Sequence, residues 1–434
     1  MWGSATASHQ VEGNNTNNNW WAWEQQPGKI LNEAKSGLAC DWWGAGGRPR
    51  WKEDFDRAAE GYQNAQRFSI EWSRVQPAPD RWDEHAIDRY REMVRTLQEL
   101  GMTPMVTLHH FTDPLWLVEM GGWESPKIID LFTTYVHKVV EALQEYVSLW
   151  ITINEPNCYV YLGYGGGGWP PGKQNQGLAF RVMETMLNAH ASAYQTIHAL
   201  QPKAMVGVAN SYRSFQPART WLPLDTWETN LLRRNWNDQF PQACQEGYFW
   251  AGIRKVHVPK AAGTQDFLGI NYYSRDRVAF SLLDAKTLFS KRTFPPGAEL
   301  SDAGFMANVP QGIFEAVKWG RRFKVPIIIT ENGVENTDDN LRRRFILQHL
   351  HQLWRAVNFN WPVKGYFHWS LVDNFEWERG WTQRFGLWEL EETTQVRRKR
   401  PSVDLYAEIC HENGISSEMV TKYAPEIFDS MFPG

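Results

Sequence analysis

The chain has 434 residues, of which 42% are hydrophobic, and a net charge of -4. This composition is ordinary for a globular protein, and no apolar stretch approaches the ~20 residues of a membrane-spanning helix. The negative net charge argues against a nucleic-acid partner. The four cysteines are scattered, without paired metal-ligand spacing or a preceding signal peptide, so we expect a reducing, cytoplasmic location.

Short apolar segments that alternate with helical segments run along the whole chain. The predicted strands lie near residues 2–7, 66–70, 104–108, 149–154, 204–209, 266–271, 325–330 and 363–369. Alternation of this kind is typical of parallel strands joined by crossover helices. No linker or change of composition divides the chain, so residues 1–434 are predicted to form one α/β domain, a closed (β/α)8 TIM barrel with elaborated βα loops.

The clearest helical pattern follows the third predicted strand. Ser125 and Pro126 fit an N-cap and a first helical position, and apolar residues recur at helical spacing from Phe132 to Val147. We expect this helix to cover the sheet.

Four other segments have predictions that rest on composition. The asparagine-rich residues 14–19 predict a mobile loop at the rim of the barrel, and the glycine-rich residues 165–172 predict a flexible loop at the entrance of a site. The basic residues 397–400 are predicted to form a solvated loop. Residues 415–434 are predicted to form a helix and a tail that cover the barrel.

Two lone glutamates end apolar runs in the two halves of the chain. Glu155 follows Ile151-Thr152-Ile153-Asn154 and precedes a proline, and Glu331 follows Ile327-Ile328-Ile329-Thr330. In a barrel of this kind the active site lies at the C-terminal ends of the strands. Two acids placed there suit glycosidic bond cleavage, because one can protonate the leaving oxygen while the other attacks the anomeric carbon. The alternative for each glutamate alone is that it ends a strand and is solvated.

The two motifs, Asn-Glu-Pro and Thr-Glu-Asn-Gly, resemble the signatures of glycoside hydrolase family 1, the β-glucosidase and β-galactosidase family. The resemblance extends from Trp2 to about Gly414, and residues 40–43 and 71–74 resemble the archaeal-type branch of that family. It implies that Glu331 is the nucleophile and Glu155 the acid and base of a double displacement. It implies substrate-binding roles for Gln10, His110, Asn154, Tyr273, Trp369, Glu376, Trp377 and Phe385, and supporting roles beside the nucleophile for Arg67 and Asn271.

The residue types suit the roles that the resemblance implies. A glutamine amide at position 10 offers a donor and an acceptor to neighbouring hydroxyls, and the Arg67 guanidinium would favour the charged form of Glu331. The resemblance also implies a cis peptide between Trp369 and Ser370. The carboxylate of Glu376 would repel a 6-phosphate, which predicts a plain glycoside as the substrate.

Two positions depart from the common pattern of the family. Phe111 stands where many members have tryptophan, and it keeps an apolar face there. Asn157 follows the Asn-Glu-Pro where many bacterial members have tryptophan, so we expect a leaving-group site that is more polar and offers less stacking.

We therefore interpret the chain as a retaining exo-β-glycosidase, a β-glucosidase that removes the terminal non-reducing β-D-glucosyl residue from oligosaccharides such as cellobiose and from aryl glycosides. Galactosyl and fucosyl residues are alternative substrates, and retention predicts carboxyl groups about 5 to 5.5 Å apart. The expected partner is a small-molecule β-glycoside, with no nucleic acid, membrane, metal or cofactor. The preferred leaving group, the oligomeric state and a trimmed native N-terminus stay open.

Two interpretations from other classes compete with this one. A barrel could be a metal-dependent hydrolase whose ligands are His109, His110, Asp113 and Glu155, although adjacent histidines cannot easily face one metal ion. A sugar-binding protein without catalysis is the second alternative, and the presence of both glutamates argues against it.

Overall fold

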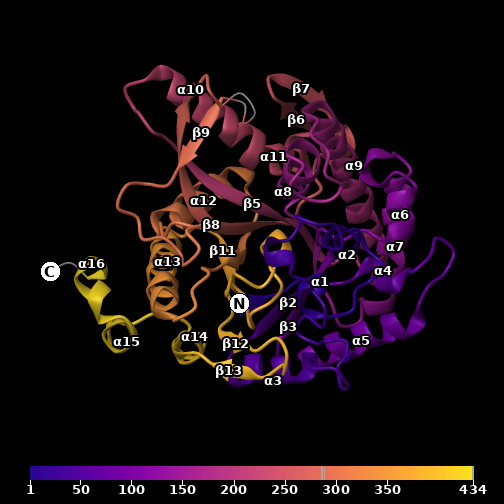
Figure 1. Ribbon diagram of the computed structural model, residues 1–434, viewed down its shortest axis with the longest axis horizontal. Coiled ribbons are helices and arrows are strands. Elements are labelled where there is room, and N and C mark those ends of the chain that lie inside the picture. The colour runs from indigo at the N-terminus through magenta and orange to yellow at the C-terminus, as the bar shows by residue number, and fades with distance from the viewer. Residues whose placement is uncertain (285–286, 288, 433–434) are drawn as a thin grey trace.

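A closed barrel of eight parallel strands forms the centre of the computed structural model, which describes residues 1–284, 287 and 289–432 (Figure 1). Each strand pairs with the next along the chain, and the last pairs with the first, so that Trp2 lies beside Tyr366. The predicted (β/α)8 barrel is confirmed. Its strands are β1 (Trp2–Ala5), β2 (Ala65–Ser69), β3 (Thr103–His109), β4 (Leu149–Asn154), β5 (Met205–Pro217), β8 (Phe267–Phe280), β10 (Ile327–Asn332) and β11 (Val363–Trp369).

Two of the strands extend well beyond their predicted ends. β5 and β8 were expected to stop at Ala209 and Asn271, but they continue to pair with each other as far as Pro217 and Val278. The end of β8 also pairs with β9 (Ser290–Thr293) in antiparallel fashion. The residues beyond the predicted ends are strand residues, and buried and partly exposed side chains are interspersed along these extensions.

Helices surround the barrel (Figure 1). The longer ones are α3 (Trp51–Glu60), α5 (Glu84–Glu99), α7 (Ile128–Leu143), α9 (Gln176–Leu200), α12 (Gln311–Gly320), α13 (Asn340–Asn358) and α14 (Pro401–Glu412). The apolar residues predicted to cover the sheet are buried on α7, with Val147 buried just after it. The predicted N-cap is wrong, because Ser125 and Pro126 form a turn in which the Ile128 amide donates to the Ser125 carbonyl at 3.1 Å.

The basic run at residues 397–400 is not the solvated loop that its composition predicts. Its first three residues form β13 (Arg397–Lys399), which pairs with β12 (Trp388–Leu390). Arg397 is buried and donates to Asp54 at 2.9 and 3.1 Å, and Arg400 donates to both oxygens of Asp373 at 2.9 Å. Buried carboxylates therefore compensate two of the four positive charges.

The asparagine-rich run is also part of the packed structure rather than the mobile loop predicted. Asn15, Asn18 and Asn19 are buried. The Asn18 side chain caps α2 (Asn19–Glu24) by accepting from the Trp21 amide at 2.8 Å. Short polar side chains thus serve here as hydrogen-bond partners for the backbone.

The C-terminal segment lies outside the ring of helices instead of covering the barrel. It forms α15 (Ser417–Tyr423) and α16 (Phe428–Met431), which lie beside α13 and α14 at the edge of the molecule (Figure 1). The Tyr423 carbonyl accepts a hydrogen bond from Arg343 at 2.8 Å.

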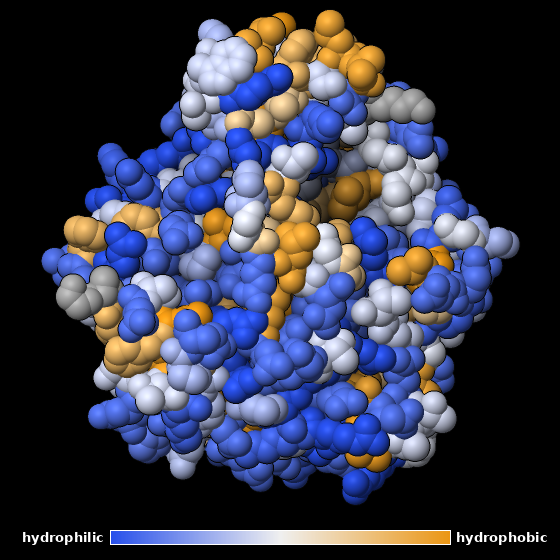
Figure 2. Space-filling view, turned by 60° about the vertical axis from the view of Figure 1, so that its left-hand side comes forward, coloured by the Kyte–Doolittle hydropathy of each residue, from blue (hydrophilic) through white to orange (hydrophobic). Residues whose placement is uncertain are grey.

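Polar residues predominate on the face shown in Figure 2, and apolar side chains gather at its upper end. Exposed apolar residues of the described chain include Trp221 beside α10 (Pro223–Leu232), Trp227 on α10, and Leu283 after β8. Across the described residues, each helix is too short or too polar to cross a bilayer.

Candidate active site

Glu155 and Glu331 lie at the C-terminal ends of β4 and β10 and line one cavity of ≈ 740 Å³. Glu331 is the penultimate residue of its strand, and Glu155 follows its strand with a left-handed φ of 41°. The Glu155 amide donates to the Ala209 carbonyl at 2.7 Å, which fixes the turn before Pro156. Both side chains are almost fully buried.

Two strong donors hold Glu331. Arg67 donates from Nη1 at 2.6 Å to one carboxylate oxygen, and the Tyr273 hydroxyl donates at 2.6 Å to the other. Burial raises the pKa of Glu331, while the Arg67 charge and these hydrogen bonds oppose that shift. The predicted pairing with Arg67 is therefore present, although burial outweighs its effect on the pKa.

Glu155 has a weaker set of donors. Asn271 donates from Nδ2 to Glu155 at 3.0 Å, and it lies on β8 beside the pair. Burial, followed by the negative charge of Glu331, raises the pKa of Glu155 to about 7. Because Arg67 and Tyr273 stabilise a charge on Glu331, the proton that the pair shares lies on Glu155.

Asn154 and His110 form a polar wall next to the two acids. Asn154 accepts from Arg67 at 2.6 Å and donates from Nδ2 to His110 Nε2 at 3.0 Å, so the proton of the imidazole lies on Nδ1. Burial, followed by the positive charge of Arg67 and by the neighbouring His109, lowers the pKa of His110 well below its ordinary value. Among the described residues His110 Nδ1 has no partner, which leaves it free to donate to a ligand.

Gln10 and Glu376 meet on the side of the barrel formed by β1 and β11. Gln10 donates from Nε2 to the Phe375 carbonyl at 2.8 Å and to Glu376 at 3.1 Å, and its Oε1 has no partner within the described ranges. Burial, followed by the charges of Glu378 and Glu331, raises the pKa of Glu376 to about 8. The raised pKa favours the protonated form of Glu376 at neutral pH, which weakens the charge repulsion expected from it against a 6-phosphate; the preference for a plain glycoside stays a prediction.

Aromatic side chains form another part of the wall. Trp369, Trp377, Phe385 and Phe111 line the cavity, and the ring of Phe111 packs against that of Trp377 at 5.2 Å. The peptide between Trp369 and Ser370 is cis, as the resemblance implies. The glycine-rich run borders the cavity through Trp169, at the predicted place.

The structure brings all the predicted site residues together. Glu155, Glu331, His110, Asn154, Tyr273, Trp369, Glu376, Trp377 and Phe385 line the cavity. The other three, Gln10, Arg67 and Asn271, are fully buried and donate hydrogen bonds to Glu376, Glu331 and Glu155 respectively.

Asn157 does not contribute to the cavity, so the polar leaving-group contact expected from it is wrong. Its side chain is fully buried and donates from Nδ2 to the carbonyls of Ser211 at 2.8 Å and Trp236 at 3.0 Å. Trp236, together with Arg213 and Asp276, lines the cavity instead. The sequence analysis did not identify these three residues, because no motif marks the segments that carry them.

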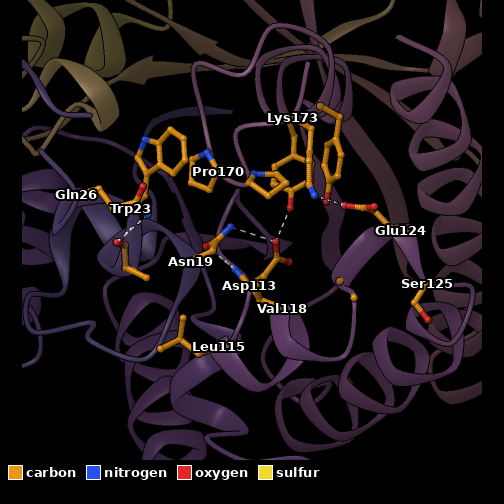
Figure 3. Close-up of a pocket in the computed structure, with 16 residues that line it drawn as sticks. Asn19, Trp23, Gln26, Asp113, Leu115, Val118, Glu124, Ser125, Pro170 and Lys173 are labelled. Atoms are coloured by element: carbon orange, nitrogen blue, oxygen red, sulfur yellow. Dashed lines mark hydrogen bonds and ion pairs between the residues drawn. The ribbon is translucent and has the colours of Figure 1, made fainter. Parts of the chain in front are cut away.

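The ligand set of the metal-dependent alternative is divided between two cavities. Asp113 lines a second cavity of ≈ 640 Å³, where it lies beside Asn19 (Figure 3), whereas His110 and Glu155 line the first. The Asp113 carboxylate accepts hydrogen bonds from His109 at 3.0 Å, Trp123 at 2.9 Å, Asn19 at 3.2 Å and Tyr159. These four bonds occupy the acceptor positions of the carboxylate. In the part of the chain that the structure describes, no group of three or more His, Cys, Asp and Glu could hold a metal ion.

Comparison with known proteins gives one consistent result. The model of glycosyl hydrolase family 1 matches residues 1–415. Beta-glucosidase A of Thermotoga maritima is 31% identical over 96% of this chain and 97% of its own length, and a beta-galactosidase of Pyrococcus woesei is 28% identical over 96% and 98%. The solved beta-glycosidase from Pyrococcus horikoshii superposes with a TM-score of 0.90 at 35% identity, covering 97% of this chain and 96% of that one.

Proposed function

Because this chain belongs to glycosyl hydrolase family 1 and is a glycoside hydrolase of the β-glucosidase type, we propose that it is a retaining exo-β-glycosidase. The proposed substrates are oligosaccharides such as cellobiose and aryl glycosides, from which it removes the terminal non-reducing β-D-glucosyl residue. Residues 1–434 would act as one catalytic domain in the cytoplasm on a small-molecule substrate.

In the first step Glu331 attacks the anomeric carbon while Glu155 gives its proton to the departing glycosidic oxygen. A covalent glycosyl ester on Glu331 results. Glu155, now ionised, removes a proton from water, and the hydroxide adds to the anomeric carbon as the bond to Glu331 breaks. The sugar leaves with its original β configuration, and Glu155 is protonated again.

The observation that carries this proposal is the unequal environment of the two acids. Arg67 and Tyr273 donate to Glu331 at 2.6 Å each, which suits an ionised nucleophile. Glu155, with a pKa raised to about 7, suits a residue that donates and later accepts a proton near neutral pH. Gln10 Oε1 and His110 Nδ1, which have no partner among the described residues, supply an acceptor and a donor for sugar hydroxyls.

The test is the stereochemistry of hydrolysis together with a substrate panel. Proton NMR during cleavage of 4-nitrophenyl β-glucoside should show the β anomer of glucose first, with the α anomer appearing later by mutarotation. Initial appearance of the α anomer would mean inversion and would contradict the roles given to Glu155 and Glu331. Aryl β-glucoside, β-galactoside and β-fucoside compared with cellobiose then decide between the alternative sugars.

A further inference from the structure

We propose that Trp236, held in place by Asn157, is the platform on which the leaving group of the substrate stacks. The inference rests on the proposed glycosidase function. It names a residue for the leaving-group side of the cavity, which the sequence motifs of the family do not describe. Trp236 lies on η4 (Arg233–Asp238), a π-helical turn after α10. It is half-buried and lines the same cavity as Glu155.

The barrel places Trp236 on the side where the leaving group must lie. Gln10 and Glu376 follow β1 and β11, which are neighbours, whereas Glu155 follows β4 and Asn157 bonds to β5 on the opposite side of the ring of strands. The acid protonates the glycosidic oxygen, so groups next to the acid and away from Gln10 face the leaving group. Trp236 is joined to this region by the hydrogen bond from Asn157 to its carbonyl.

The tryptophan ring is supported from behind and fixed at its backbone. The ring of Tyr161 stacks on it at 5.8 Å and 17°, and Phe180 contacts Tyr161 edge-on at 6.4 Å. The Tyr161 hydroxyl donates to Gln239 at 3.0 Å. Asn237, the next residue after Trp236, accepts from the Arg213 amide at 3.0 Å and donates to its carbonyl at 2.9 Å. A ring held this rigidly loses little freedom when a ligand stacks on it.

Polar groups in the same cavity define the ligand class more closely. Arg213 donates to both oxygens of Asp276 at 2.7 and 3.1 Å, and both residues line the cavity with Trp236. A flat aromatic face together with a paired guanidinium and carboxylate suits a pyranose ring, which has an apolar face and a hydroxyl edge. The leaving group is therefore a second sugar ring, and an aryl ring would use the aromatic face alone.

The experiment compares kcat/KM for cellobiose, 4-nitrophenyl β-glucoside and β-glucosyl fluoride in wild type and in Trp236→Ala. We expect at least about a tenfold loss for cellobiose and a comparable loss for the aryl glucoside, because each has a ring that stacks. The fluoride has no ring in its leaving group, so its kcat/KM should change by less than about twofold. Trp227→Ala is the matched control, since Trp227 is an exposed tryptophan on the neighbouring helix α10 and does not line the cavity.

Trp236→Leu keeps apolar bulk without an aromatic face and gives the same test if the alanine variant does not fold. Asn157→Ala should show the same pattern in smaller degree, because Asn157 acts on the substrate indirectly, by holding the Trp236 backbone against β5. Equal loss on all three substrates would assign Trp236 a structural role, and no loss on cellobiose would exclude stacking; either result overturns the inference. A wild-type enzyme that cleaves none of the three substrates would instead refute the proposed function itself.

Discussion

Neutralising Glu331 should lower the pKa of Glu155, because the charge of Glu331 is the second cause, after burial, of the raised value of about 7. For two carboxyls about 5.5 Å apart in a site with an effective dielectric constant of about 20, the repulsion is about 3 kcal/mol. This corresponds to about two pKa units, and relaxation of the site makes it an upper limit. Glu331→Gln, which removes the charge and keeps the shape, should therefore lower the pKa of Glu155 by one to two units, on the order of this repulsion.

The assay is a titration of carboxyl-labelled glutamate followed by carbon NMR, with Glu155→Gln used to assign the resonance. In wild type the same ionisation should appear in kcat/KM, which needs Glu155 protonated and Glu331 ionised. The rate should fall as the pH rises through about 7 and fall again as the pH drops through the pKa of Glu331. A Glu155 pKa that is the same in wild type and in Glu331→Gln would refute the coupling between the two carboxyls. Burial would then be the whole cause of the raised pKa of Glu155.

Three further outcomes test other parts of the structure. Glu331→Gly should not hydrolyse glycosides but should form the α-glycosyl azide when azide is added. Glu155→Ala should form the β-glycosyl azide from substrates with good leaving groups. The same anomer from both variants would contradict the roles given to Glu331 and Glu155. The ratio of kcat/KM for an aryl glucoside to that for its 6-phosphate should be at least about a hundredfold, and a ratio below one would show that the Glu376 region accepts phosphate. Arg400→Met should lower the free energy of unfolding by about 3 to 5 kcal/mol in denaturant titrations, because it leaves the buried Asp373 carboxylate without its charged partner. Arg398→Met, at an exposed ion pair, should lower it by less than about 1 kcal/mol. Equal effects of the two substitutions would contradict the role of burial.

The strands and the two acids could be predicted because their signals are local. Several barrel strands contain a short apolar run, and Glu155 and Glu331 each follow such a run, so a barrel that gathers strand ends at one face also gathers the acids. The predicted contact between Arg67 and Glu331 likewise required only the positions of two strand ends and the family motif. Each such feature is marked by residues within a few positions of each other in the sequence. The barrel topology then brings the marked strand ends together.

The predictions that failed depend on partners that lie far away in the sequence. Arg397 bonds to Asp54, 343 positions earlier, and nothing in a run of basic residues indicates that half of them are buried. Asn157 was interpreted from its neighbours as a cavity residue, but its amide reaches the Trp236 carbonyl, 79 positions later. Trp236 was missed for the same reason, since it enters the cavity only because β5 and the chain after it fold back beside Glu155.

Burial also decides how the cavity distributes its charge. Arg67 contacts Glu331, and Glu331 is the carboxylate that this guanidinium can neutralise directly. Glu155 and Glu376 share the cavity, and burial, with a smaller contribution from the charge of Glu331, raises the pKa of each, to about 7 and about 8. An ionised carboxylate without such a partner is costly in a buried site, so near neutral pH a substantial fraction of each of these two groups is protonated. Glu155 can therefore donate to the leaving oxygen, and a neutral Glu376 can both donate to and accept from a sugar hydroxyl. The discrimination that we predict against a 6-phosphate then rests more on the bulk of Trp377 and on the cost of dehydrating a dianion next to it than on the charge of Glu376.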